Sequence, residues 1–292
     1  MRFLKRKHPD TSANPYAVLL ALLFLLTGCH ADAPSADAPE PASDYSAPKI
    51  TLTSSDLETV CETPDSIDLN QITTGECLIT QPGCHILSGD LDGTIRIDVE
   101  DQLVHLVLNG VTVSCAQGPA LEVISAGKVF VTLQENTENF LADGAAYPKS
   151  TDADACIYSP CDMTINGSGT LHVYGYYKDA VHSKDVLKIL GGNLFVQSKR
   201  DGLRGNDGVV IRTESLTVQS EENAVHSTKS GKETKGNIEI YDTVCSFIGG
   251  KYAISCSTDL YIAGSSVYAI GILADVNTAG ISSIEEGNLQ NE

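Results

Sequence analysis

The stretch Ala180-Val-His-Ser183 returns as Gly202-Leu-Arg-Gly205 and again as Ala224-Val-His-Ser227, each time 22 residues further along the chain. Related stretches stand at 155–159 and 253–256. Two more short stretches follow each copy, and in all of them apolar residues alternate with other residues, as in a strand with one buried face. A unit of 22 residues holds three such strands with tight corners and is too short to be a domain.

A repeat of this size buries its apolar face only by stacking on its neighbours, with like strands paired in parallel. Connections between parallel strands are right-handed by default. The sequence therefore predicts an all-β fold, a right-handed single-stranded parallel β-helix (solenoid) of about eight three-strand coils over residues 49–274. We expect 54–70 to cap the first coil and 275–292 to form an acidic C-terminal tail or a cap. Residues 142–154 and 229–235 interrupt the repeat and are predicted surface loops.

The first residues are typical of an export signal, because a cationic start precedes an apolar run too short to span a bilayer comfortably. The run ends at Leu26-Thr-Gly-Cys29, which resembles the lipobox of bacterial lipoproteins. We expect residues 1–28 to be a lipoprotein signal peptide and 29–48 a lipidated flexible tether that starts at Cys29. The protein would then be extracytoplasmic, membrane-anchored on the bacterial cell surface. The alternative is an ordinary signal peptide, with Cys29 incidental.

The chain carries a formal net charge of −19. Such a surface repels nucleic acid and anionic lipid, so we expect neither as a partner beyond the lipid anchor, and we expect a monomer. An acidic surface suits hard divalent cations. Of nine cysteines, eight remain once Cys29 is set aside, an even number that permits disulfides in an exported chain. Pairing of near neighbours, Cys77 with Cys84 and Cys156 with Cys161, and simple buried thiols both stay open.

Like positions of adjacent coils lie about 4.8 Å apart, so a residue type that recurs at the repeat period forms a row on the surface. Asp179, Asp201 and Asn223 form such a row just before the first strand of successive coils. Carboxylates this close repel one another unless water or a cation compensates them, and calcium takes oxygens of Asp and Asn. We therefore predict calcium ligands at these three positions.

A second acidic row follows the same strand, and it consists of Asp162, Asp185, Asp207 and Asp259. Asp185 and Asp207 are further candidate calcium ligands. For this row, however, the favoured explanation is that Asp occupies corners because its side chain accepts backbone hydrogen bonds.

Basic and aromatic residues accompany the acidic rows in a chain that is otherwise poor in cations. Their candidate role is to bind substrate, the basic groups by pairing with sugar carboxylates and the tyrosines by stacking on sugar rings. The alternatives are local neutralisation of the aspartates and tyrosines that merely cover coil ends. The candidate substrate-binding residues are Tyr176, Tyr177, Lys178, His182, Lys184, Arg200, Arg204 and His226.

An ordered series of motifs resembles a family of secreted bacterial carbohydrate-binding β-helix proteins. The motifs are Leu106-Val-Leu-Asn-Gly-Val-Thr-Val, Val129-Phe-Val-Thr-Leu, Ile165-Asn-Gly-Ser-Gly-Thr-Leu and Asp201-Gly-Leu-Arg-Gly-Asn-Asp. The resemblance implies a lipoprotein or cell-surface protein that binds pectin and cellulose, holds calcium in the β-helix and is similar in fold to polysaccharide lyase family 9. The family's acidic corners are matched only in part, so the metal role passes to Asp179, Asp201 and Asn223 alone.

Three functions stay open. We expect the protein to bind polysaccharide, either acidic pectin-like or cellulosic glycans, without cleavage and with calcium. The first alternative is a calcium-dependent polysaccharide lyase acting on uronate polymers by β-elimination, with Lys178, Lys184 or Arg204 as the base. Each of these stands beside an aspartate, which raises a basic pKa where a catalytic base needs it lowered. The second alternative is a structural surface scaffold.

Overall fold

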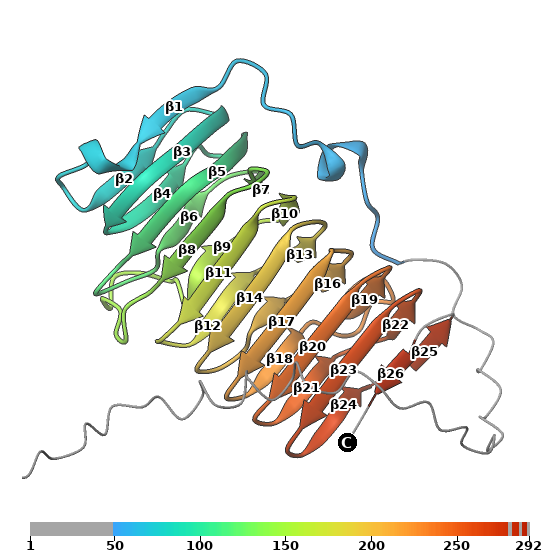
Figure 1. Cartoon of the computed structure of the whole chain (residues 1–292). Helices are drawn as coiled ribbons and strands as arrows, with labels where there is room; N and C mark the ends of the chain where they lie inside the picture. The colour runs from blue at the N-terminus through green and yellow to red at the C-terminus, as the bar shows by residue number, and fades with distance from the viewer. Residues whose placement is uncertain (1–48, 280–281, 286–287, 291–292) are drawn as a thin grey trace, which may run out of the picture. The chain divides into compact units, whose positions relative to one another are not determined.

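The computed structural model describes residues 49–279, 282–285 and 288–290 (Figure 1). The predicted signal peptide, the lipidated Cys29 and the tether lie outside these residues. Within them the protein is all-β, as predicted. Strands β1 to β26 are accompanied by two short 3-10 helices, η1 (Ser54–Leu57) and η2 (Leu69–Gln71). None of the helices in this part of the chain has the length and apolar character needed to cross a membrane.

The strands pair in parallel along three ladders, each with one strand per repeat. The first ladder runs through β2 (Glu76–Ile79), β4 (Thr94–Asp98), β6 (Leu121–Ser125), β9 (Ala155–Ser159), β12 (Asp179–Ser183), β15 (Leu203–Gly205), β18 (Asn223–Ser227), β21 (Tyr252–Cys256) and β24 (Ala274–Thr278).

The second ladder runs through β1 (Asp65–Asp68), β3 (Gly83–Asp92), β5 (Leu103–Ser114), β7 (Lys128–Leu133), β10 (Met163–Gly167), β13 (Val186–Ile189), β16 (Gly208–Ile211), β19 (Asn237–Tyr241), β22 (Leu260–Ala263) and β25 (Ser282–Glu285). The long strands β3 and β5 continue into the third ladder, which adds β8 (Glu138–Ala142), β11 (Thr170–Gly175), β14 (Asn193–Ser198), β17 (Ser215–Ser220), β20 (Val244–Gly249), β23 (Ser266–Gly271) and β26 (Asn288–Gln290).

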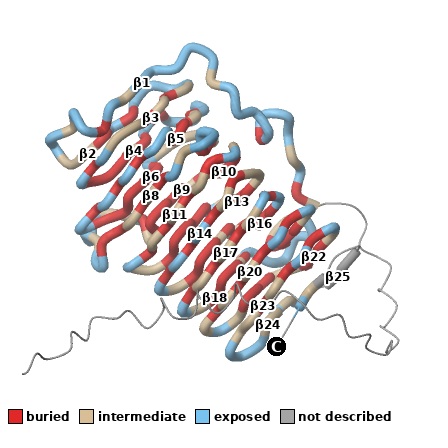
Figure 2. The backbone as a smooth tube through the Cα atoms, in the orientation of Figure 1, coloured by how far each residue is buried: buried red, intermediate tan, exposed pale blue. Residues whose placement is uncertain are grey.

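The register of the ladders follows the sequence repeat. In the first ladder Val181 pairs with Leu203 and Leu203 with Val225, which are steps of 22 residues. Like apolar residues therefore stack into rows that fill one core, and a fully buried row in the second ladder consists of Ile165, Ile189, Ile211, Ile240 and Ile262. Each such side chain stabilises the fold by roughly 1.5–3 kcal/mol. Figure 2 shows buried positions along the strands of the ladders.

The arrangement is like that of a parallel β-helix, while its handedness and the count of about eight coils stay predictions. The ladders also continue beyond residue 274, where the sequence suggested a tail or a cap. Strands β24, β25 and β26 pair with β21, β22 and β23. Val276 and Leu289 pack against the core there. The segment is rich in Ser, Asn and Gly, which hides its strand pattern.

Residues 49–64, which we call the strap, run along the outer side of the second ladder (Figure 1). At one end Lys49 and Ile50 donate backbone N–H groups to Glu239 of β19, at 2.7 and 3.0 Å. Further along, Asp56 accepts from Lys128 of β7 at 2.5 Å and from Lys188 of β13 at 2.9 Å. Only β1, after the strap, joins the end of the stack, so the predicted cap over 54–70 lies mostly along the side.

The cysteines follow neither near-neighbour pairing. Cys84 forms a disulfide with Cys61 of the strap, 23 residues away, and not with Cys77. Cys156 and Cys161 are separate buried thiols, as are Cys77, Cys115, Cys245 and Cys256. The reason is the pleat, because Cys77 and Cys156 point into the apolar core whereas Cys84 lies at the corner that the strap crosses.

Candidate functional site

The predicted row of Asp179, Asp201 and Asn223 is assembled on the first ladder. The backbone N–H of Asp201 donates to Asp179 Oδ1 at 3.0 Å, and that of Asn223 donates to Asp201 Oδ1 at 3.3 Å. The corner before Asp179 is tight, because a Cβ on Gly175 would lie 2.7 Å from the Asp179 carbonyl oxygen. All three side chains of the row are buried.

Arginine and histidine side chains take up the carboxylate oxygens of this row, whereas Asn223 Oδ1 has no hydrogen-bond partner among the described residues. Arg200 donates to both carboxylate oxygens of Asp179 at 2.5 Å, and its Nη2 also reaches Asp154 Oδ2 at 2.6 Å. Asp201 accepts from Asn223 Nδ2 at 2.6 Å, and its Oδ2 lies 2.7 Å from His226 Nδ1. Arg200 therefore neutralises Asp179 in place, which the sequence left open as an alternative, and His226 contacts Asp201.

Asp154 is a member of this cluster that the sequence analysis missed. It ends the 142–154 excursion, and its Oδ1 lies 2.6 Å from His182 Nδ1. Arg204 is a more distant neighbour, with Nη1 3.5 Å from Asp179 Oδ2 and 3.9 Å from Asp154 Oδ2. Because Asp154 lies outside the repeat, no periodic signal marks it.

The pKa values of these groups depend on two opposing effects, burial and pairing with oppositely charged groups. Burial raises the pKa of Asp179, and the nearby Asp201 charge adds to this despite the hydrogen bonds from Arg200. Burial also opposes ionisation of Asp154, but His182 and Arg200 hold its pKa well below the usual range. The pKa of Arg200 is raised, since its two carboxylate partners outweigh its own desolvation.

The second acidic row is likewise paired with protein groups. Asp162 Oδ1 accepts from the backbone N–H of Val186 at 3.0 Å, which is the corner role favoured from the sequence. Asp207 forms ion pairs with Lys229 and Lys235, both brought in by the 229–235 excursion. Asp185 lies 3.8 Å from Lys229 Nζ. At the far end of the row Asp259 pairs with Lys49 of the strap.

These contacts test whether the predicted ligands fit calcium. Ligand atoms of Asp154, Asp179 and His182 lie within 4.8 Å of one another, as a metal site requires. Arg200, however, donates into the same two carboxylates, and a guanidinium and a divalent cation repel each other. Asp201 and Asp207 are also already paired. With Arg200 in place, the carboxylates of Asp154 and Asp179 do not fit calcium.

The candidate substrate-binding residues at the corner of the same ladder are partly covered. Tyr177 stacks on Tyr147 of the 142–154 excursion at 4.4 Å between ring centroids, and Lys178 Nζ lies 4.8 Å from the Tyr177 centroid. Lys184 lies over Tyr158, and a hydrogen bond to the Tyr158 hydroxyl raises the Lys184 pKa. Tyr176 and Lys184 are the exposed members of the set.

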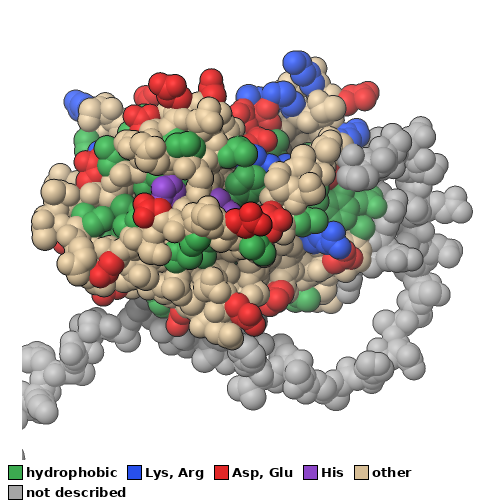
Figure 3. Space-filling view, turned by 90° about the horizontal axis from the view of Figure 1, so that it is seen from above, with side chains coloured by type: hydrophobic (Ala, Val, Ile, Leu, Met, Phe, Trp, Pro, Cys, Tyr) green, Lys and Arg blue, Asp and Glu red, His purple; other side chains and the backbone are tan. Residues whose placement is uncertain are grey.

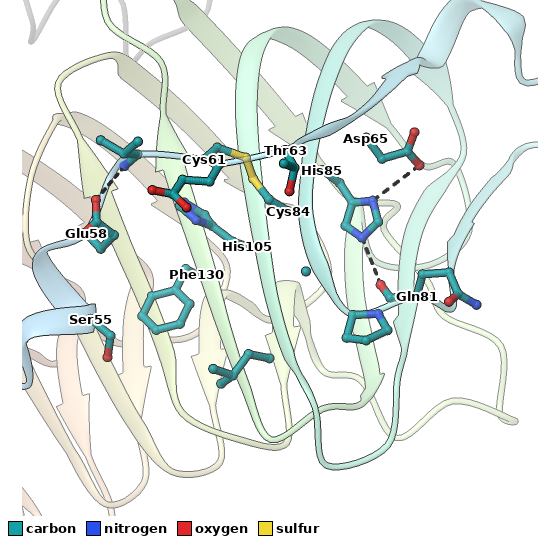
Figure 4. A pocket seen from close by; sticks show the side chains of 15 residues that line it. Ser55, Glu58, Cys61, Thr63, Asp65, Gln81, Cys84, His85, His105 and Phe130 are labelled. Atoms are coloured by element: carbon teal, nitrogen blue, oxygen red, sulfur yellow. Dashed lines mark hydrogen bonds and ion pairs between the residues drawn. A yellow bond between two sulfur atoms is a disulfide. The ribbon is translucent and has the colours of Figure 1, made fainter.

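A pocket of about 620 Å³ lies between the strap and the second ladder, far along the chain from the residues singled out by the repeat. Its walls come from the strap and β1 on one side and from β3, β5 and β7 on the other (Figure 4). The Cys61–Cys84 disulfide fixes the strap to β3 within this wall. Figure 3 views the molecule from above Figure 1 and shows histidine side chains among acidic and hydrophobic ones.

The position of the strap is marked by burial on the outer face of the second ladder. Thr164, Lys188 and Glu239 occupy outward positions of the second ladder, yet all three are buried. A buried lysine and a buried glutamate on an outer face require partners, and the strap provides them. What marks the covering segment is thus a break in the expected exposure of the repeat, which no inspection of the periodic residues alone reveals.

The chain is similar in sequence to known proteins. A family model of carbohydrate-binding domain-containing proteins matches residues 73–287. A carbohydrate-binding domain-containing protein from Acetivibrio thermocellus is 34% identical over 140 residues, which cover 46% of this chain and 49% of the relative. The chain therefore spans about half the length of that curated relative.

A solved structure is also similar. It is that of a polysaccharide lyase-like protein from C. thermocellum, a gadolinium derivative, with a TM-score of 0.68 and 26% sequence identity, covering 78% of this chain and 98% of that one. The family match takes in the three ladders from β2 to β25. Because that match spans most of the residues, this chain belongs to the family of carbohydrate-binding domain-containing proteins.

Proposed function

We propose that this protein binds polysaccharide without cleaving it. The observation that carries the proposal is the family match over 73–287, which spans the ladders rather than one motif. We further propose that it does so outside the cytoplasm, at the bacterial cell surface, held by a lipid on Cys29 after removal of residues 1–28. Calcium assistance stays a prediction of the sequence, and the proposed function does not depend on it.

Charge favours a neutral, cellulosic glycan over an acidic, pectin-like one. The chain has a formal net charge of −19, which repels a polyuronate. The arginine and histidines predicted to bind sugar carboxylates are engaged with aspartates, Arg200 with Asp179 and Asp154, and His226 with Asp201. An acidic glycan would have to displace these buried pairs, whereas a neutral glycan would not.

The second candidate function is a polysaccharide lyase, because the similar solved structure is described as polysaccharide lyase-like. A β-elimination base must lose its proton near neutral pH. The pKa of Lys184 is raised by its hydrogen bond with Tyr158, and Arg204 stands close to Asp179 and Asp154. The raised pKa keeps Lys184 in its charged form and so favours binding over cleavage. A structural scaffold is the third candidate.

The test is retention of the full chain on insoluble cellulose and in gels cast with soluble neutral glycans or polygalacturonate. We expect retention by the neutral glycans and little by polygalacturonate. Retention by none of them overturns the proposal and favours the scaffold. In parallel, polygalacturonate incubated with the protein and calcium is followed at the absorbance of unsaturated products. A rise with turnover establishes the lyase instead.

A further inference from the structure

The pocket beneath the strap has the size and composition of a ligand site. Its volume of about 620 Å³ lies within the roughly 300–1,000 Å³ typical of small-molecule sites. One wall is fixed by the Cys61–Cys84 disulfide, and the strap beside it is held by Asp56 on Lys128 and Lys188. The pocket is therefore built by a non-repeating segment clamped at two points.

The charge of the pocket is acidic. Glu58, Glu62 and Asp65 line it, and among the described lining residues none is lysine or arginine. The nearby Lys128 pairs with Asp56 and lies 4.8 Å from the centroid of the Phe130 ring. A sugar carboxylate would meet three carboxylates here without a compensating cation. The pocket thus disfavours uronates.

One ring nitrogen of a buried histidine in the pocket has no hydrogen-bond partner among the described residues. His85 is only 5% exposed, and its Nε2 lies 2.9 Å from the Gln81 carbonyl oxygen, to which it must donate. In the tautomer that carries its proton on Nε2, Nδ1 is an acceptor, and it has no hydrogen-bond partner among the described residues. It faces Asp65 Oδ2 at 3.7 Å, which is too long for a hydrogen bond (Figure 4).

Two acceptors that face each other are both satisfied by a ligand that places hydrogen-bond donors between them. Neighbouring hydroxyls of a sugar ring are donors of this kind, one to His85 Nδ1 and one to the Asp65 carboxylate. Apolar surface for the C–H face of the ring lies alongside, since Leu103 is 55% exposed and Val60 is 65% exposed in the same pocket. Carboxylates, a bare imidazole nitrogen and apolar side chains together match a polyhydroxylated, uncharged ring.

We propose that the pocket between the strap and strands β3, β5 and β7 is the subsite that binds a neutral sugar unit of the glycan. Asp65 and His85 accept its hydroxyls, and Leu103 and Val60 contact its apolar face. This inference rests on the proposed function and gives it a location. It moves the glycan site from the first ladder, where the sequence placed it, to a surface that the repeat does not build.

The test measures binding of cellohexaose to the full chain by calorimetry. Asp65→Asn removes an ionised acceptor, and we expect about fivefold weaker binding. Leu103→Ala removes exposed apolar contact area, and we expect a loss of about five- to tenfold. The matched control is Leu78→Ala, because Leu78 is 53% exposed on β2 and does not line the pocket. Binding by the control should equal that of the unaltered chain.

A second readout is local to the pocket. The half-buried sulfurs of Cys61 and Cys84 line it, so a bound sugar should slow reduction of this disulfide, followed by maleimide labelling. Slower reduction and the two selective losses support the subsite. Retention on cellulose with unchanged affinity in both variants overturns the subsite and leaves the proposed function standing. Tighter binding of a galacturonate oligomer than of cellohexaose overturns the subsite as well, and failure to bind any glycan overturns both.

Discussion

The charged face of the first ladder and the pocket beneath the strap differ in how fully their polar groups are satisfied. On the first ladder the charged groups are paired, since Asp179 receives two bonds from Arg200 and Asp201 faces His226 and Asn223, although Asn223 Oδ1 is a buried acceptor without a hydrogen-bond partner among the described residues. In the pocket, His85 Nδ1 and Asp65 face each other as acceptors without a donor. A surface whose charges are matched internally is poor at binding, and one with unmatched acceptors is prepared for a ligand.

This difference follows from how each surface is made. A repeat brings equal residues to within about 4.8 Å, so every acidic row must be neutralised in place for the stack to be stable. Segments outside the repeat supply part of that neutralisation, as Lys229 and Lys235 do for Asp207. The strap contacts the second ladder at Lys188, at Glu239 and, just before β22, at Asp259, and leaves a concavity where it passes β3, β5 and β7.

Replacement of Asp56 should have the largest effect, because this residue holds the strap. Asp56→Ala leaves the ammonium groups of Lys128 and Lys188 buried without their carboxylate. We expect the free energy of unfolding to fall by about 3–5 kcal/mol, measured by urea denaturation. We also expect cellohexaose binding to weaken, since the pocket wall is released.

The control for Asp56 is Glu62→Ala, an exposed acidic residue of the same strap. It should change the free energy of unfolding by no more than about 0.5 kcal/mol. A loss below about 1 kcal/mol in Asp56→Ala would show that the strap is not anchored through this carboxylate.

Replacement of Asp179 probes the other surface. Asp179→Ala removes two charge-assisted bonds to Arg200, which keeps Asp154 as a partner. We expect a loss of about 1.5–3 kcal/mol in the free energy of unfolding, with cellohexaose binding unchanged. A double-mutant cycle with Arg200→Ala isolates the pair, and the exposed Glu221→Ala serves as the control. Loss of glycan binding in Asp179→Ala with the fold intact would return the site to the first ladder.

The sequence predicted the all-β class and the parallel pairing because both depend on periodic apolar residues, such as the row from Ile165 to Ile262. It also predicted that Asp179, Asp201 and Asn223 come together, since their spacing equals the repeat. Both predictions follow from the rule that residues at like positions of successive repeats stack on one another.

The partners of those residues were not predictable in the same way. Arg200 was placed near Asp179, but whether its side chain turns to the protein or to a ligand depends on Asp154, which a loop of irregular length delivers. The pocket depends on a chain segment that reaches Lys128 from Asp56, 72 residues away, and on a disulfide that spans 23 residues. Contacts of this kind carry no local pattern.

The contribution of the corner beside the first ladder to the stability of the fold should depend on pH. Burial raises the pKa of Asp143 to about 6, although Tyr147 and the backbone of Tyr176 donate to it. The unfolded value is about 3.9, so between about pH 4 and 6 the folded state binds more protons than the unfolded state. Stability from this group therefore falls as pH rises through that window, by about 2–3 kcal/mol, measured by thermal unfolding.

Asp143→Asn isolates this effect, because the amide does not titrate. The difference in unfolding free energy between the unaltered chain and the variant should shrink or reverse as pH rises from about 4 to about 6, and stay constant above that range. The lowered pKa values of Asp56 and Asp154 act in the opposite sense at lower pH, and they cancel in the comparison. A difference that does not vary with pH would place the Asp143 carboxyl in contact with water.

Calcium should have the smallest effect of all on the unaltered chain. Arg200 occupies the carboxylates of Asp154 and Asp179, so millimolar calcium in place of a chelator should shift the melting temperature by less than about 1 °C. Arg200→Gln removes the guanidinium and leaves ligand atoms of Asp154, Asp179 and His182 within 4.8 Å of one another. That variant should gain a calcium-dependent rise of a few degrees, with the control Lys251→Gln unresponsive. A clear rise in the unaltered chain would instead show that calcium competes with Arg200 or uses other oxygens, and the first ladder would then be a metal-dependent surface as its sequence suggests.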